Sequence, residues 1–425
     1  MSGDIIGFAG MTHLGLNSAA AAADRGFNVI CFDPDTLLIA ALERGELSVV
    51  EPDLPEVLRS NAHRIRFTAD PKVLTLCDLI YVAPDVPTDN TGQSDLAGIN
   101  ALILEIEAAT RLDAVMVILS QVPPGFTRAR MHPGRLFYYQ VETLIFGRAI
   151  KRARFPERFI VGCAEPAETL PPVLARFLGS FGCPILPMRY ESAELAKISI
   201  NMCLVASVSV ANTMAELCEQ IGADWSEIVP ALKLDRRIGA YSYLSPGLGI
   251  AGGNLERDLA TVLSLAKRHG TDGGIVSAWV ANSRYRKDWV WSVIDKLVLT
   301  QKPDARVAVL GLAYKEDTHS TKNSPSLALL SHLGGREVVV YDPVVSPNDA
   351  KIPFKAASSA MAAIDGADVV CIMTPWGEFK KILPSDFVEH MRGRCLIDPY
   401  RIVDSKAARA AGLRHVTLGV APDEA

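Results

Sequence analysis

The sequence predicts an α/β protein with two Rossmann-like, doubly wound parallel-sheet domains joined by a helical middle domain that contains a long central helix. Three observations support this fold class. Short apolar runs alternate with helical patterns before residue 190 and again after residue 301, as in parallel sheets covered on both faces. The stretch 192–221 has helical periodicity and contains neither glycine nor proline. The two outer regions also resemble each other in sequence.

The strands of the outer regions are expected at short, continuous apolar runs rich in β-branched residues. These runs cover 28–33, 78–83 and 114–119 in the first region and 306–311, 337–342 and 368–373 in the last. Asn28-Val-Ile-Cys-Phe-Asp-Pro34 is echoed by Glu337-Val-Val-Val-Tyr-Asp-Pro343, which indicates two related nucleotide-binding folds. We expect domains at 1–190, 191–300 and 301–425.

The composition is that of a water-soluble globular chain. It has 425 residues, of which 49% are hydrophobic, and no apolar run approaches the ~18 residues of a membrane span. The N-terminus lacks the basic segment of a signal peptide, so we expect a cytoplasmic protein. A net charge of -5 without a basic block excludes a nucleic-acid footprint. The eight cysteines form no CxxC pair, so buried free thiols are expected rather than disulfides or a metal site.

A candidate phosphate-binding loop follows the first strand. Gly10-Met11-Thr12-His13-Leu14-Gly15 has the outline of GxGxxG with threonine at the middle glycine, and an alanine-rich helix then runs to Arg25 and Gly26. The glycines of this motif let the backbone approach a pyrophosphate at a helix N-terminus. The hydroxyl of Thr12 is expected to remain available as a donor. His13 has no partner in the sequence, and we interpret its side chain as filling the loop.

Asp33 ends the second expected strand, 18 residues after Gly15. A carboxylate at this place accepts hydrogen bonds from the adenosine ribose and favours NAD over NADP. The order of strand, glycine loop, helix, strand and acid predicts a dinucleotide-binding domain. The alternative is an ordinary strand-turn-helix with a surface aspartate.

Two polar residues of the expected central helix form a candidate pair. Lys197 and Asn201 are four residues apart and therefore project from one face. An ammonium beside a carboxamide suits an alkoxide or an oxyanion. Such a pair more often marks a solvated face, but the neighbouring residues Leu195, Ile198, Ile200 and Met202 are apolar and favour a site.

A glycine-dense loop precedes the next helical pattern. Gly247, Gly249, Gly252 and Gly253 occupy four of seven positions and are followed by Asn254 and Asp258. Such a loop allows close backbone approach to a ligand, with Asn254 or Asp258 presenting a side chain. A flexible interdomain turn would look the same.

These residues together resemble the UDP-glucose/GDP-mannose dehydrogenase family along almost the whole chain. The matching segments include Pro87-Thr88 with Asp95-Leu96, Ser120-Gln-Val-Pro-Pro-Gly125, Glu142 with Gly147, Pro156-Glu-Arg-Phe-Ile-Val-Gly162, Ala193-Glu-Leu-Ala-Lys197, Asp235-Arg-Arg237-Ile-Gly239, Gly311-Leu-Ala-Tyr-Lys315, Ser324-Pro325, Tyr341-Asp-Pro343 and Thr374-Pro-Trp-Gly-Glu-Phe379.

The resemblance implies an NAD domain, a helical dimerisation region and a C-terminal domain for the nucleoside-diphosphate sugar. It implies that Lys197 and Asn201 stabilise oxygen charge, that Asp258 helps to activate water and that Glu142 lies near the reacting carbon. The remaining implied contacts are Thr88 and Gln121 for the cofactor, together with the loop from Gly10 to Gly15 and Asp33, and Arg237, Tyr243, Gly249, Gly252, Lys315 and Arg401 for the substrate, Arg237 acting across a homodimer.

The departures from the family pattern gather at the reacting carbon. Asn254 stands where the family has a cysteine whose thiolate traps an aldehyde and leaves a thioester. Gln121 replaces a threonine, Phe146 replaces a glutamate, and Lys322-Asn323 replaces an Arg-Glu pair. This division between an altered centre and a preserved binding framework predicts retained binding with altered chemistry.

The expected activity is hydride transfer between NAD and a carbinol of a UDP- or GDP-hexose, without a thioester and stopping at two electrons. The alternatives are an epimerase that retains NADH and a four-electron oxidation through a hydrated aldehyde, with Asp258 or Glu142 activating water. A non-catalytic binder of NAD or a sugar nucleotide is a further alternative, although it has no need of Lys197, Asn201 and Asp258.

Overall fold

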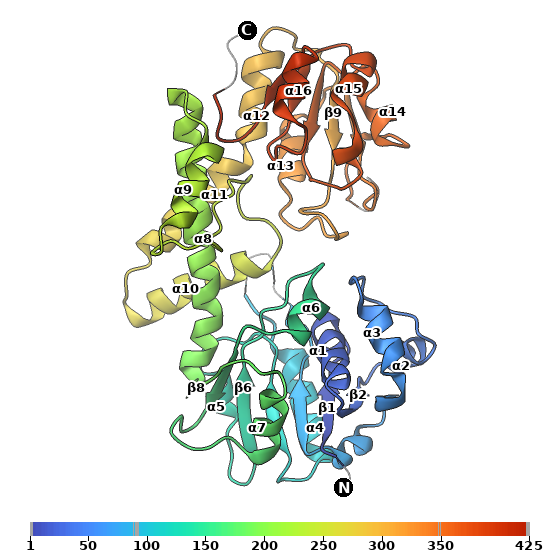
Figure 1. The fold of residues 1–425 in the computed structure, drawn as a ribbon, viewed down its shortest axis with the longest axis vertical. Helices are drawn as coiled ribbons and strands as arrows, with labels where there is room; N and C mark the ends of the chain where they lie inside the picture. The colour runs from blue at the N-terminus through green and yellow to red at the C-terminus, as the bar shows by residue number, and fades with distance from the viewer. Residues whose placement is uncertain (1–2, 88, 90–92, 347, 349, 422–425) are drawn as a thin grey trace. The chain divides into compact units, whose positions relative to one another are not determined.

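The computed structural model describes residues 3–87, 89, 93–346, 348 and 350–421. The chain divides into two compact units, Met1–Ile200 and Asn201–Ala425. Each unit contains a sheet covered by helices, and helical segments come between the two sheets along the chain (Figure 1). The predicted α/β class with two Rossmann-like folds is confirmed.

The first unit is built on an eight-stranded sheet in the order β3-β2-β1-β4-β5-β6-β7-β8. All three strands expected in this region form, each within one residue of the expected bounds. Among the described strands, only the β6–β7 pairing is antiparallel, with Tyr139 opposite Gly162, which departs from the all-parallel expectation. The strands are β1 Ile5–Ala9, β2 Asn28–Phe32, β3 Ile65–Thr68, β4 Leu79–Val82, β5 Val115–Ile118, β6 Leu136–Gln140, β7 Phe159–Cys163 and β8 Ile185–Arg189.

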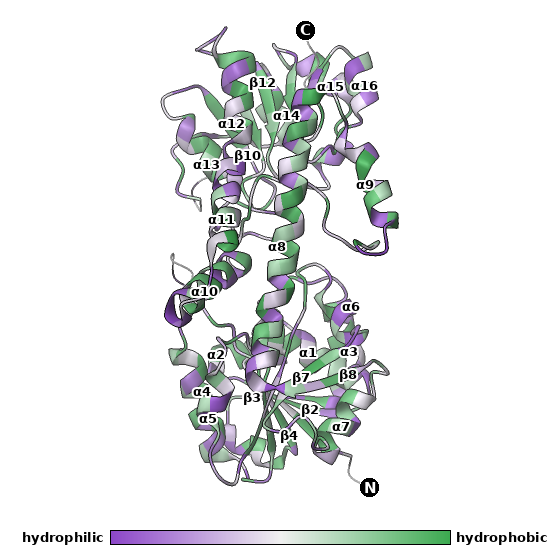
Figure 2. Ribbon diagram, turned by 90° about the vertical axis from the view of Figure 1, so that its left-hand side faces the viewer, coloured by the Kyte–Doolittle hydropathy of each residue, from purple (hydrophilic) through white to green (hydrophobic). Residues whose placement is uncertain are grey.

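Helices cover both faces of this sheet because successive strand side chains point to opposite sides. Phe8 and Tyr81 pack into one buried cluster, whereas Ile80 and Val82 pack into another. Figure 2 shows these central strands as largely hydrophobic. The helices are α1 His13–Asp24, α2 Thr36–Glu43, α3 Leu54–Ser60, α4 Ala97–Ala109, α5 Phe126–Arg130, α6 Ala149–Arg154 and α7 Pro172–Gly179, with short 3-10 turns at Ala62–Arg64 and Pro71–Leu76.

The long helix α8, Tyr190–Ile221, carries the chain from the first unit into the second and confirms the helix expected at 192–221. Its N-terminal part is fixed to the first unit by the buried Glu194, whose carboxylate accepts the backbone N–H groups of Gly125 and Thr127 at 2.6 and 2.8 Å. By length and composition α8 is the one described helix that meets the requirement for a membrane span. This is weak support for a span, because central helices of soluble proteins meet the same requirement.

The second unit places four helices before a six-stranded sheet in the order β11-β10-β9-β12-β13-β14, whose described pairings are all parallel. The three strands expected here also form. The elements are α9 Trp225–Leu234, α10 Asn254–His269, α11 Gly274–Lys287, α12 Trp289–Ile294, a π-helical turn Asp295–Leu299, β9 Val307–Leu310, α13 Pro325–His332, β10 Val338–Tyr341, β11 Lys355–Ala356, α14 Ala360–Ile364, β12 Val369–Ile372, a 3-10 turn Phe379–Lys381, α15 Pro384–His390, β13 Cys395–Ile397, α16 Ser405–Ala410 and β14 Arg414–Val416.

The sequence echo between the outer regions corresponds to a shared local device. In the first sheet Asp33 accepts the N–H of Met11 at 2.7 Å, and in the second sheet Asp342 accepts the N–H of Leu312 at 2.7 Å. In both sheets the acid at the end of the second strand therefore ties down the turn that follows the first strand.

Candidate functional site

The phosphate-loop candidate forms a tight turn between β1 and α1. Gly10 has a φ of 96°, a conformation that L side chains rarely adopt. A β-carbon added to Gly15 would lie 1.9 Å from the Gly10 carbonyl oxygen, so only glycine fits there. The turn delivers the chain directly into the first turn of α1, where backbone N–H groups are unpaired within the helix.

Thr12 caps α1 but does not offer its hydroxyl to the turn. Its Oγ1 donates to the carbonyl oxygen of Ala83 at 3.1 Å. The expectation that this hydroxyl is available as a phosphate donor is therefore wrong, because the end of β4 lies within reach and supplies an acceptor. Leu14, in the first turn of α1, is buried in the core.

His13 is not a loop filler, because the structure gives it a buried partner. Its Nε2 lies 2.9 Å from a carboxylate oxygen of Glu51, whose side chain is fully buried. The ring also lies against Phe146, with ring centroids 4.1 Å apart. Glu51 was missed from the sequence because it stands in a loop with no motif or periodicity, 38 residues from His13.

Asp33 lies where the sequence placed it, at the end of β2 and partly exposed. One carboxylate oxygen accepts from Met11 and the other accepts the N–H of Asp35 at 3.0 Å. Each carboxylate oxygen can accept more than one hydrogen bond, so a ribose hydroxyl remains compatible with these contacts. Thr88 lies outside the described residues, and Gln121 follows β5 with partial exposure.

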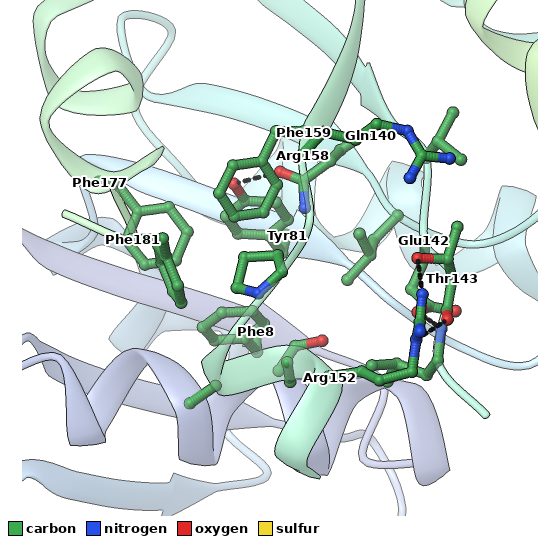
Figure 3. Close-up of a pocket in the computed structure, with 17 residues that line it drawn as sticks. Phe8, Tyr81, Gln140, Glu142, Thr143, Arg152, Arg158, Phe159, Phe177 and Phe181 are labelled. Carbon is green, nitrogen blue, oxygen red and sulfur yellow. Dashed lines mark hydrogen bonds between the residues drawn. The ribbon is translucent and has the colours of Figure 1, made fainter. Parts of the chain in front are cut away.

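Glu142 follows β6 and lines a small pocket of ≈ 60 Å³ (Figure 3). Phenylalanine rings and Tyr81 occupy one side of the view, and Glu142, Thr143 and Arg152 lie together at the other. Burial raises the pKa of Glu142, and the positive charge of Lys197 opposes this rise. Glu142 also accepts the N–H of Leu144. The first unit thus places a partly buried carboxyl within electrostatic reach of Lys197.

Asn201 and Asp258 form a buried pair in the second unit. The Asn201 amide donates to Asp258 at 2.5 Å, and both residues are less than a tenth exposed. The other oxygen of Asp258 accepts from the buried Arg257 at 3.2 Å. α10 packs against α8 here through a small apolar cluster that includes Val205 and Leu259. The sequence predicted the individual residues, and the fold brings them together.

The glycine-dense loop ends at Gly253, which caps α10, and exposes Asn254 as the first helical residue. Gly252 has a φ of 85° and its N–H bonds the carbonyl of Lys322 at 2.9 Å. A β-carbon at Gly253 would lie 3.2 Å from the Lys322 Nζ. The segment 322–323 therefore lies directly against the start of α10.

Asn323 completes this contact. Its amide donates to the Gly252 carbonyl at 3.1 Å and also to Glu256. Burial raises the pKa of Glu256, and the positive charge of Lys287 is the largest opposing influence. The residues that depart from the family pattern at 254, 322 and 323 therefore lie together in the second unit, whereas the other two altered positions, Gln121 and Phe146, belong to the first unit.

The implied substrate residues are only partly brought together. Gly252 packs toward the ring of Tyr314, whose edge would meet an added β-carbon at 3.0 Å, and the Lys315 ammonium lies 5.8 Å from the same ring centroid. Gly249 has a φ of 78° and lies against the Ser283 carbonyl. Tyr243 is half exposed.

The two implied arginines have acidic partners in the second unit. The side chain of Arg237 is 90% exposed and pairs with Asp235 at 2.6 Å. Arg401 has a φ of 53° and its guanidinium pairs with Asp224 at 3.0 Å. Each guanidinium is thus paired with an acid of the same unit, and neither side chain is buried.

The cysteines are free thiols, as expected, and most are buried. Cys203 is exposed and Cys183 is intermediate, whereas the remaining six are buried. Cys203 lies two residues beyond Asn201 on α8 and so points away from the helix face that contacts Asp258. Within the described ranges, no group of three or more His, Cys, Asp or Glu side chains is placed to hold a metal.

Comparison with known proteins covers nearly the whole chain. Residues 5–174 match the NAD binding domain of the UDP-glucose/GDP-mannose dehydrogenase family, 191–284 its central domain and 308–405 its UDP binding domain. A UDP-glucose 6-dehydrogenase of Pseudomonas aeruginosa is 30% identical over 97% of this chain and 96% of its own length. The UDP-glucose 6-dehydrogenase TuaD of Bacillus subtilis is 28% identical over 96% of this chain and 92% of its own.

Solved structures share the fold. A UDP-D-ManNAc dehydrogenase of Pyrococcus horikoshii superposes with a TM-score of 0.84 at 24% identity, covering 98% of this chain and 99% of the other. A UDP-glucose dehydrogenase of Pyrobaculum islandicum gives 0.83 at 24% identity, covering 99% of both chains. With the phosphate loop and the three matched domains, these findings show that the chain is an NAD-binding member of the UDP-glucose/GDP-mannose dehydrogenase family.

Proposed function

We propose that this protein oxidises a carbinol of a nucleoside-diphosphate hexose with NAD, stops after two electrons and forms no thioester. The observation that carries the proposal is the side chain at the first residue of α10. Asn254 is exposed at this place, where the family resemblance implies a thiolate. A carboxamide does not add to an aldehyde in the way a thiolate does, so the trap for a second oxidation is missing.

The residues of the first unit fit NAD. Gly10 and Gly15 form a turn that leaves no room for a side chain at its closest approach, and α1 begins there with unpaired N–H groups. Asp33 lies partly exposed at the end of β2, where a carboxylate can accept a ribose hydroxyl. When bound, NAD supplies the hydride acceptor.

Residues of α8 and α10 supply charge stabilisation at the carbinol oxygen. Lys197 and Asn201 lie one turn apart on α8 and project from one face. We assign both to the oxygen that becomes an alkoxide and then a carbonyl. The carbinol loses one hydride from carbon and one proton from oxygen, and we assign the proton to Glu142. The carboxylate of Asp258 contacts both Asn201 and Arg257. We therefore assign Asp258 the role of orienting the Asn201 amide.

The altered residues at the start of α10 favour noncovalent binding of a carbonyl oxygen over a covalent adduct. Lys322 replaces an arginine of the family pattern and lies against Gly253, beside Asn254. Its ammonium and the first N–H groups of α10 both favour a partial negative charge at this place. The cluster is therefore suited to bind a carbonyl oxygen without forming a bond to it.

The substrate is proposed to be a UDP-hexose, with the C6 carbinol as the position attacked. The named relatives are UDP-glucose 6-dehydrogenases, and one structural neighbour is a UDP-D-ManNAc dehydrogenase. Arg401, Lys315 and, across a dimer, Arg237 are the proposed substrate contacts, with Tyr243 and the glycines at 249 and 252. We also propose a cytoplasmic location and a role in supplying polysaccharide precursors.

The proposed dimer uses the outer face of α8. Val210, Met214, Leu217 and Ile221 repeat at spacings of four, three and four residues and are between 39 and 65% exposed. This spacing forms one apolar stripe along a helix, which a second copy of the same helix complements.

We expect the wild-type protein to sediment at twice the mass of its chain and Leu217→Glu to sediment as a monomer, because two charges would be buried at the shared stripe. Glu227→Gln, at the first turn of α9, serves as the control because it leaves the stripe intact. A monomeric wild-type protein at micromolar concentration would contradict the proposed dimer.

The reaction is tested by incubating the purified protein with NAD and UDP- or GDP-hexoses while recording NADH absorbance and identifying the sugar by NMR. We expect one NADH per sugar oxidised and a product carrying an aldehyde or its hydrate. Asn254→Cys is expected to raise the ratio toward two NADH and to yield a uronate, because the thiolate permits the second hydride transfer.

Each other outcome identifies a different reaction. Two NADH per sugar with a uronate product in the wild-type protein would show that a hydrated aldehyde is oxidised without the thiol, which rejects the two-electron proposal. An inverted carbinol without net NADH would identify an epimerase. Ligand binding without any turnover would identify a non-catalytic binder.

A further inference from the structure

The buried carboxylate of Glu51 joins three separate segments of the first unit. Its two oxygens accept the N–H of Gly147 at 3.0 Å and of Ala149 at 2.6 Å, and one also lies 2.9 Å from His13 Nε2. The segments are the start of α1, the loop after β6 and the start of α6. A carboxylate that is fully removed from water must be compensated by such contacts, so these segments are held together by one side chain.

His13 is fixed from two sides. Glu51 holds its Nε2, and the Phe146 ring lies against the imidazole with centroids 4.1 Å apart and an interplanar angle of 30°. His13 is the first residue of α1 and its side chain is only 11% exposed. The ring therefore lies at the end of the helix that receives the dinucleotide and forms part of the wall between that helix and the loop after β6.

The same loop carries Glu142. Phe146 lies four positions after Glu142, and Figure 3 shows Glu142 and Thr143 beside Arg152 of α6. Arg152 donates to the Thr143 carbonyl at 2.8 Å, so the beginning of the loop is tied to α6, and the Ala149 N–H at the start of α6 is held by Glu51. A movement of Glu51 would thus change the setting of α1, of α6 and of the segment that presents Glu142.

We propose that Glu51 is a positioning residue of the NAD site, which holds His13 and Phe146 at the start of α1 and couples NAD binding to the loop that carries Glu142. The physical reason is pre-organisation. A loop that is already ordered does not lose conformational entropy when the dinucleotide binds, whereas a released loop must be ordered at that moment. The inference uses the NAD-binding domain and does not depend on which reaction follows.

The first test is NADH binding by Glu51→Gln and His13→Phe, measured by NADH fluorescence. The glutamine keeps the volume but turns an N–H₂ group toward donors, and the phenylalanine keeps the ring stack but removes the contact to Glu51. We expect each variant to weaken NADH binding about tenfold, and the double variant to weaken it little further, because both changes remove one interaction. UDP binding, which reports on the second unit, is expected to stay unchanged.

The second test measures the order of the loop after β6 by amide hydrogen exchange. In the wild-type protein NADH is expected to slow amide hydrogen exchange at 144–149, and in Glu51→Gln this protection is expected to be lost even at saturating NADH. Glu46→Gln is the matched control, because Glu46 is an exposed residue of the same unit paired with Arg44. It is expected to leave both readouts at wild-type values.

Folded variants with wild-type UDP binding and NADH affinity within about twofold of wild type would overturn the proposal, since the expected effect is about one order of magnitude. Strictly additive losses in the double variant would also overturn it, because they would place His13 and Glu51 in separate interactions. If Glu51→Gln does not fold, the proposal is tested with His13→Phe alone. The measurements are then its NADH affinity and its hydrogen exchange at 144–149 with NADH.

Discussion

Lys197→Met is expected to lower kcat by about 10²–10³-fold while NADH and UDP still bind, because an oxyanion-stabilising group acts mainly in the transition state. The methionine keeps most of the side-chain volume on α8 and removes only the charge. The measurement is kcat for the best UDP-hexose together with the two binding constants. Lys151→Met, an exposed lysine of α6, is the control and is expected to retain full activity.

A second readout separates a direct role of Lys197 from a structural one. Burial raises the pKa of Glu142 and the Lys197 charge lowers it, so removing that charge lets the pKa of Glu142 rise further. If Glu142 accepts the proton in its ionised form, the acidic limb of the kcat/KM profile moves to higher pH in Lys197→Met. Full activity in this variant with intact ligand binding would contradict the role given to Lys197.

Asp258→Asn is expected to reduce both the stability of the second unit and kcat. Asp258 and Arg257 are both buried, and replacing the carboxylate leaves the arginine charge without this compensation. Breaking a buried pair in this way costs about 3–5 kcal/mol of unfolding free energy. The loss of the fixed Asn201 orientation is expected to lower kcat by roughly 10²-fold on the scale of a single oxyanion donor. Urea unfolding and steady-state kinetics measure the two effects.

The double variant Arg257→Met with Asp258→Asn distinguishes the two effects. It removes the arginine charge as well and is expected to recover part of the stability, whereas kcat stays low because the carboxylate that holds Asn201 is still absent. Glu316→Gln, which breaks the exposed pair with Lys380, is expected to change stability by less than about 1 kcal/mol. Near-wild-type stability and kcat in Asp258→Asn would contradict the role given to this carboxylate.

Local chemistry in the sequence was sufficient for much of the fold. The apolar runs at 28–33 and 306–311 predicted strands because a strand buried on both faces must be apolar throughout. The uninterrupted periodicity at 192–221 predicted α8 because neither glycine nor proline stops the helix there. Gly10 and Gly15 predicted the tight turn, since the conformation of one and the close contact of the other exclude side chains.

The direction of strand β7 was decided only in the folded sheet. An apolar run such as 159–163 satisfies a parallel or an antiparallel neighbour equally well, because hydrophobicity does not encode hydrogen-bond direction. In the structure β7 runs antiparallel to β6 and parallel to β8.

The pairings that define the candidate site also belong to the tertiary structure. The sequence by itself determined the elements and the residue types that bear chemistry, because helix period, strand pattern and glycine conformation are properties of neighbouring residues. Glu51 and His13 are 38 residues apart, and Asn201 and Asp258 are 57 apart. Such pairs form only when helices and loops pack, because burial then removes water as the competing partner and leaves each polar group with the one the fold supplies.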